Sequence, residues 1–166
     1  MIDLETLGTN PDCPVISIGA TFFDIEKKVL GPTFYLPLDI QSQLDAGRKV
    51  DADTIKWWLG QSNAAKHVFK EKAQDPKKVL ELLSQFVKQH PKSYVWGNGS
   101  TFDITILESL YATYGLDYPW SHFNIMDLRT FKRFIARGKK VMNHGVSHNA
   151  LDDAISQAQY VMNNMK

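Results

Sequence analysis

Residues 15–23 read Val15-Ile-Ser-Ile-Gly-Ala-Thr-Phe-Phe23, a run rich in β-branched and aromatic side chains. Such a run is typical of a buried β-strand. A turn near Lys27 and a second strand-like stretch, Val29 to Leu38, predict a hairpin with this strand. Residues 1–6 are a further short strand candidate. We therefore expect the chain to begin with three strands in an antiparallel meander.

The rest of the chain alternates helical and strand-like segments. Helical signals begin near Asp53, Ser62, Asp75-Pro76, Asp103, Asp127 and His148, and short strands are expected at Tyr94–Trp96 and Phe123–Met126. We find no repeat, low-complexity tract or linker. The order of elements predicts an α/β fold with a mixed sheet, organised as one domain over residues 1–166.

The composition is that of an ordinary globular protein. The chain has 166 residues, 43% hydrophobic, with 19 Lys and Arg against 18 Asp and Glu, so net charge does not point to an anionic partner. No stretch is long enough to span a membrane, and no secretory signal is evident. Cys13 is the only cysteine, which excludes an internal disulfide and argues against a cysteine-ligated zinc. We expect a cytoplasmic protein.

Residues 129–140 form the one strongly basic segment. It could be a solvated helix face, or it could contact the phosphates of a nucleic acid. The segment has no acid among its basic residues Arg129, Lys132, Arg133, Arg137, Lys139 and Lys140.

Two acids, Asp3 and Glu5, lie in the first strand candidate. Because side chains alternate along a strand, both carboxylates project from one face. Acids near a core sheet are unfavourable unless compensated, and a divalent cation such as Mg²⁺ prefers oxygen ligands. The alternative is an exposed edge strand with two solvated acids.

Asp103 precedes Ile106, Leu107 and Leu110 by three, four and seven residues, which places it on the apolar stripe of a helix. It could be a paired, buried acid or a first-turn capping residue.

His148 and Asp153 open the last predicted helix. They could simply be a cap and a first-turn acid. Asp152 and Asp153 point about 100° apart, and periodicity alone does not choose between them.

Taken together, these residues give the order Asp-x-Glu, Asp, His-x-x-x-x-Asp, in the segments Ile2-Asp-Leu-Glu-Thr-Leu-Gly8, Phe102-Asp103 and His148-Asn-Ala-Leu-Asp-Asp-Ala154. This pattern resembles the DEDDh exonucleases, the superfamily of the polymerase proofreading subunit and of RNase T. The resemblance covers nearly the whole chain. The segment from Thr54 to Ser62 looks more particularly like the phage exonuclease A group, which shares a broader family with the mycobacterial RNase AS group.

The resemblance implies an RNase H-like fold with a five-stranded mixed sheet flanked by helices. It also implies two divalent cations, Mg²⁺ or Mn²⁺, with Asp153 rather than Asp152 as the last ligand. Asp3 would bridge both cations, Glu5 and Asp103 would complete the ligand set, and His148 would be the general base. One departure is that only Met1 and Ile2 precede Asp3, so either the first strand is short or the true start lies upstream.

The same resemblance implies residues that contact the substrate. Thr6 and Leu7 would meet the terminal nucleotide, and Phe102 could stack on an unpaired base or belong to the core. Trp57 and Trp58 have the same two interpretations, with at least one expected in the core.

We therefore expect a metal-dependent 3′→5′ exonuclease that releases nucleoside monophosphates from single-stranded DNA ends. One alternative is an exoribonuclease acting on RNA 3′ ends, which the 2′-hydroxyl would distinguish. Others are a catalytically silent nucleic-acid-binding module and a metal-free hydrolase with paired carboxylates, such as a glycosidase. The oligomeric state, including a homodimer, is left open.

Overall fold

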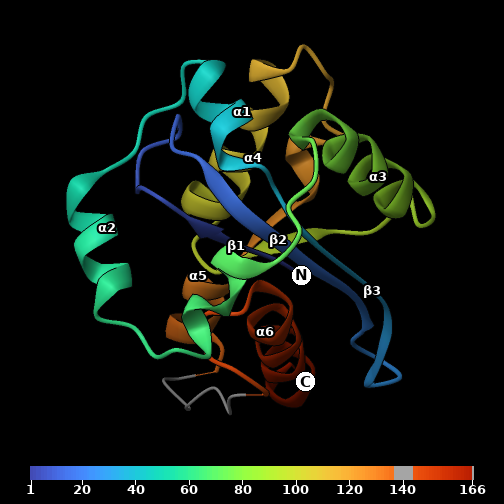
Figure 1. Cartoon of the computed structure of the whole chain (residues 1–166). Coiled ribbons are helices and arrows are strands. Elements are labelled where there is room, and N and C mark those ends of the chain that lie inside the picture. Colours follow the sequence, from blue (N-terminus) through green and yellow to red (C-terminus); the bar gives the residue numbers. More distant parts are fainter. Residues whose placement is uncertain (137–143, 166) are drawn as a thin grey trace.

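The computed structural model describes residues 1–136 and 144–165 (Figure 1). Its elements, in chain order, are β1 (Ile2–Thr6), β2 (Val15–Asp24), β3 (Val29–Pro37), α1 (Ile40–Asp45), α2 (Ala52–Leu59), the 3₁₀ helix η1 (Ala65–Lys70), α3 (Pro76–Lys88), β4 (Val95–Gly97), α4 (Ser100–Thr113), the 3₁₀ helix η2 (His122–Asn124), β5 (Ile125–Asp127), α5 (Leu128–Phe134) and α6 (Ala150–Asn164).

The predicted N-terminal meander is confirmed. β2 lies between β1 and β3 and pairs antiparallel with both. Asp3 is opposite Gly19 and Glu5 is opposite Ser17, and the register shifts between Glu5 and Thr6. This irregularity falls directly after the second of the two strand acids.

The α/β class is confirmed, but the prediction of a single five-stranded sheet is wrong for the described residues. β4 and β5 pair in parallel as a separate two-stranded sheet. β4 has three residues and contacts β1 without a regular ladder between them. At the start of the following helix, the pKa of Asp103 is affected by the backbone amide of Leu4, so this helix lies close to β1 even though β4 does not pair with it.

Several helices differ from the expectation in their bounds. α1 was not predicted, although Asp39 caps it by accepting a hydrogen bond from the Ser42 amide at 2.7 Å. The segment after Ser62 is a 3₁₀ helix rather than an α-helix. The last helix begins at Ala150, and His148 lies before it, because His148 has a left-handed backbone with φ of 64°.

The start of α6 lies directly against the sheet, and Gly19 makes this possible. A Cβ atom on Gly19 would lie 2.1 Å from the backbone carbonyl carbon of Ala150, a distance that no side chain tolerates. α6 packs against β1, β2 and β3, and Figure 1 shows it below the strands, next to the C-terminus. The acids at the start of α6 are thereby brought to the level of Asp3 on β1.

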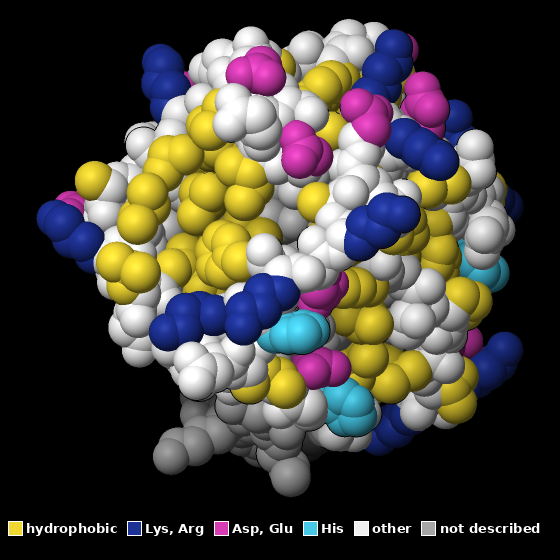
Figure 2. Space-filling view, viewed as in Figure 1, with side chains coloured by type: hydrophobic (Ala, Val, Ile, Leu, Met, Phe, Trp, Pro, Cys, Tyr) yellow, Lys and Arg dark blue, Asp and Glu magenta, His cyan; other side chains and the backbone are white. Residues whose placement is uncertain are grey.

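The charged side chains on the surface are of both signs, as the nearly equal numbers of basic and acidic residues suggest. On the face shown in Figure 2, Lys and Arg are interspersed with Asp and Glu, and no single-sign patch dominates. None of the helices in the described part of the chain is long and apolar enough to cross a membrane.

Candidate active site

Asp3 and Glu5 are buried on β1, with exposed fractions of 9% and 6%. Their spacing on the strand turns both carboxylates toward the same cavity, as the sequence predicted. The Asp3 carboxylate accepts a hydrogen bond from Nε2 of Gln157 on α6 at 2.7 Å. The exposed-edge alternative is therefore excluded for this strand.

Asp103 reaches the same cavity from the first turn of α4 and is 2% exposed. Gly97 leaves room for it, because a Cβ atom there would lie 3.2 Å from Oδ2 of Asp103. Among the described residues, this Oδ2 atom is buried with no hydrogen-bond partner. A buried carboxylate oxygen without a donor keeps its lone pairs available for a cation or a proton.

The two neighbouring acids of α6 have different partners. The Asp152 carboxylate accepts from the Val146 amide at 2.7 Å, whereas the Asp153 carboxylate accepts from the His148 amide at 2.9 Å. Asp153 lines the cavity and Asp152 does not. The structure thus places Asp153 in the site, and Asp152 holds the preceding loop.

His148 lies on that loop, at the edge of the cavity. One of its ring nitrogens, one oxygen of the Glu5 carboxylate and one oxygen of the Asp153 carboxylate lie within 4.8 Å of one another. The five residues predicted for the site, from β1, α4, the loop and α6, therefore all line one cavity of about 350 Å³.

The carboxylates disfavour one another's charged forms. Burial, followed by repulsion from Asp153 and Asp103, raises the pKa of Glu5 from 4.5 to about 8. Burial, with Asp103 and Glu5 as the next contributors, also raises the pKa of Asp3 well above its ordinary value. The pKa values of Asp103 and Asp153 are raised as well, mainly by burial. Such a cluster is unfavourable unless it is protonated or neutralised by cations.

These residues fit a divalent cation. Four carboxylates supply the hard oxygen ligands that Mg²⁺ and Mn²⁺ prefer, and the unpaired Oδ2 of Asp103 is available to bind. No cysteine lines the cavity, which argues against a soft-metal site.

Basic side chains that the sequence did not single out individually complete the cavity. Arg129 and Lys132, both on α5, line its wall, and Lys132 donates to Oδ1 of Asn98 at 3.2 Å. Arg129 packs over Gly99, where a Cβ atom would come within 2.8 Å of the guanidinium carbon. The sequence signal was their spacing of three residues, which puts both on one helix face. This part of the basic segment faces the site, whereas Arg137, Lys139 and Lys140 lie outside the described residues.

A second, larger cavity of about 700 Å³ adjoins the first, and the two share Glu5, Phe102, Arg129 and His148 among their lining residues. Thr6 also lines the second cavity. Phe102 is half-buried, and it both lines the cavities and packs against the core.

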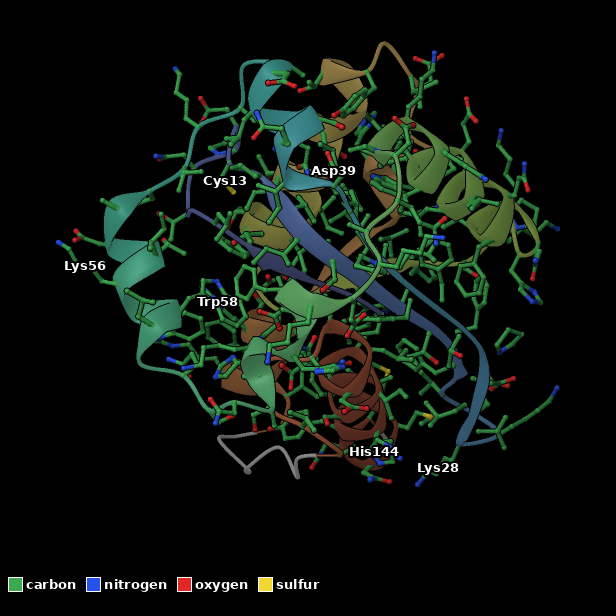
Figure 3. All side chains as sticks on the ribbon, in the orientation of Figure 1. Cys13, Lys28, Asp39, Lys56, Trp58 and His144 are labelled. Atoms are coloured by element: carbon green, nitrogen blue, oxygen red, sulfur yellow. The ribbon has the colours of Figure 1, made fainter. Side chains whose placement is uncertain are left out.

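Leu7 differs from the other predicted substrate residues. It is buried against Ile16, Trp58 and Val68 and lines neither cavity. The two tryptophans of α2 also differ from each other: Trp58 is 3% exposed, as expected for core, whereas Trp57 is 44% exposed in the wall of the second cavity. Figure 3 shows Trp58 extending from α2 toward the strands.

One protein family matches nearly the whole chain. The model of the 3'-5' exoribonuclease Rv2179c-like domain matches residues 1–165. The search of curated proteins gave no match.

Similar solved structures show the same fold. The nuclease domain of 3'hExo, a DEDDh family member bound to rAMP, is similar with a TM-score of 0.64 at 16% identity, over 98% of this chain and 88% of that one. The cell-death related nuclease 4 (CRN-4) has a TM-score of 0.64 at 15% identity, over 98% and 61%. A full-length 3'-exonuclease has a TM-score of 0.61 at 16% identity, over 98% and 78%. Because the family match covers nearly the whole chain, the protein belongs to the Rv2179c-like 3'-5' exoribonuclease domain family.

Proposed function

We propose that this protein removes nucleoside 5′-monophosphates one at a time from the 3′ ends of single-stranded RNA. The observation that carries the proposal is the convergence of Asp3, Glu5, Asp103, Asp153 and His148 on one cavity with Arg129 and Lys132 in its wall. The family is named for 3'-5' exoribonuclease activity, which favours RNA over the single-stranded DNA expected from the sequence. One similar nuclease domain is also bound to rAMP.

The four carboxylates would hold divalent cations, and four are enough to ligate two. Bound cations would stabilise charge on the phosphate and help to activate water. The repulsion among Asp3, Glu5 and Asp103 supports this assignment, because cation binding relieves it.

His148 would be the general base. Its imidazole lies at the edge of the cavity, beside Glu5 and Asp153, where it can accept a proton from the attacking water. The water oxygen bonds to phosphorus, the bond from phosphorus to the 3′ oxygen of the preceding nucleotide breaks, and that oxygen takes up a proton from solvent while His148 returns its own proton to solvent. The products are a nucleoside 5′-monophosphate and an RNA shortened by one nucleotide with a free 3′-hydroxyl.

Arg129 and Lys132 would pair with phosphates of the bound strand. Arg129 lies where the two cavities meet, so a chain whose terminal phosphate is at the carboxylates would place another part of its backbone near this guanidinium. The second cavity, with Thr6 and Phe102 in its wall, would take a base or sugar.

The test uses 5′-labelled single-stranded RNA and DNA of one sequence, incubated with Mn²⁺, Mg²⁺ or EDTA. We expect a ladder of products shortened from the 3′ end, dependent on metal and faster with RNA. Asp103→Asn is expected to abolish the ladder. Asp117 is exposed and lines neither cavity, so Asp117→Asn should leave the ladder unchanged. Faster degradation of DNA than of RNA would show that DNA is the preferred substrate. Degradation in EDTA, or of closed circular substrates, would refute the mechanism.

A further inference from the structure

The position of the His148 ring is not fixed by its own backbone. The His148 amide donates to Asp153, and its left-handed φ of 64° holds the loop in place. These contacts leave the side-chain torsions free, and a base must hold its ring nitrogen in a narrow range of positions to act.

Trp57 supplies a contact to the ring itself. The indole of Trp57 and the imidazole of His148 meet edge to face, with centroids 4.9 Å apart and planes at 86°. This is a favourable arrangement for two aromatic rings. Among the aromatic residues in the described part of the chain, Trp57 is the one whose ring contacts His148.

Trp57 is in turn connected to the strand that carries Glu5. It meets Trp58 edge to face, with centroids 5.1 Å apart. Trp58 is buried and donates from Nε1 to the backbone carbonyl of Thr6 at 2.9 Å. Thr6 follows Glu5 on β1, so an unbroken set of contacts runs from the strand through α2 to the imidazole.

We propose that Trp57 is a positioning residue for His148, and that the tryptophan pair of α2 sets the distance between the imidazole and the carboxylates of β1. The proposal rests on the function proposed above, in which His148 is the base. It assigns α2 a role through Trp57, which is 44% exposed yet contacts the His148 ring.

The competing role for Trp57 is stacking on a substrate base, because it lines the second cavity. The two roles predict different kinetics. Loss of a base-stacking contact raises KM, whereas loss of a positioning contact lowers kcat at nearly constant KM.

The experiment compares Trp57→Ala, Trp57→Phe and Leu59→Ala with the native protein on 5′-labelled RNA. We expect Trp57→Ala to lower kcat roughly 3- to 10-fold, the size of an edge-to-face aromatic contact, with little change in KM. Trp57→Phe keeps an aromatic edge and should restore most of kcat. Leu59 is 71% exposed on the same helix and lines neither cavity, so Leu59→Ala should behave as native.

A readout that needs no hydrolysis separates this proposal from the proposed function. The imidazole proton signals of His148, assigned by their loss in His148→Ala, should shift in the NMR spectrum of Trp57→Ala because the indole ring current is removed, and should stay in place in Leu59→Ala. Unshifted signals, or a raised KM with native kcat in Trp57→Ala, would overturn the positioning role. If the native protein were inactive but the His148 signals shifted in Trp57→Ala, the proposed function would be refuted, while the contact between the Trp57 and His148 rings would be supported.

Discussion

Glu5→Gln should stabilise the metal-free protein at high pH. In the folded chain the pKa of Glu5 is raised from 4.5 to about 8, chiefly by burial and by repulsion from Asp153. For an acid whose folded pKa is raised, stability is fully present below the unfolded pKa and is lost as the pH rises toward the folded pKa. The window of loss therefore runs from about pH 4.5 to about pH 8.

The magnitude follows from that window. At about 1.36 kcal/mol for each tenfold step in proton concentration, ionising Glu5 removes about 5 kcal/mol of folding free energy by pH 8. This is an upper value, because the neighbouring carboxylates take up part of the proton binding. Glutamine is nearly isosteric and does not ionise, so we expect Glu5→Gln to gain roughly 2–5 kcal/mol at pH 8.5 in EDTA and less than about 1 kcal/mol at pH 5. For a chain of this size the gain at pH 8.5 corresponds to about 5–15 °C in Tm.

The assay is urea or thermal unfolding of native protein, Glu5→Gln and Glu81→Gln at both pH values, with EDTA and with Mn²⁺. Glu81 is exposed on α3, so its variant controls for the loss of an ordinary carboxylate. Mn²⁺ should stabilise the native protein at pH 8.5 more than Glu5→Gln, since the variant lacks one ligand. A gain that is the same at pH 5 and pH 8.5, or no gain in EDTA, would show that Glu5 is not held in a repulsive cluster and would refute the reasoning.

Three other changes test other parts of the site. In Gly19→Ala the new Cβ would collide with Ala150 at the start of α6. We expect the free energy of unfolding to fall by at least roughly 1–3 kcal/mol, and the rate of RNA degradation to fall with it. Arg129→Gln should raise KM and reduce the slope of log KM against log salt by about 1, whereas the exposed Arg133→Gln on the same helix should change neither. His148→Ala should keep Mn²⁺ binding by calorimetry but lose roughly 10²- to 10⁴-fold in turnover, and loss of Mn²⁺ binding would make the histidine a ligand instead.

The sequence predicted the site's acids where secondary structure fixes side-chain direction. Asp3 and Glu5 follow from strand alternation and Asp103 from its place on an apolar helical stripe, and all three line the cavity. The choice between Asp152 and Asp153 came only from family resemblance, because it depends on the loop before α6. Backbone amides of that loop donate one hydrogen bond to each of the two carboxylates, and the periodicity of the sequence does not predict these bonds.

Other features depended on contacts between distant segments. Gln157 hydrogen bonds to Asp3 across 154 positions, and only its spacing of four residues from Asp153 hinted that it shares that helix face. Arg129 and Lys132 belonged to a segment that could equally have been solvated. The expected single sheet was wrong: β4 is three residues long, and in the described part of the chain it forms a ladder with β5 alone.

The carboxylate cluster and the close approach of α6 to the sheet have a common physical basis. Gly19 allows the start of α6 to touch β2, which brings Asp153 and Gln157 beside Asp3 but also gathers four acids in a buried space. Such a gathering opposes folding, since burial and mutual repulsion both raise the acids' pKa values. Cations that bind there would relieve the repulsion, so metal affinity and the stability of this corner of the fold are thermodynamically linked. The residues that would make the site reactive are therefore the ones that make the metal-free fold least stable at neutral and alkaline pH.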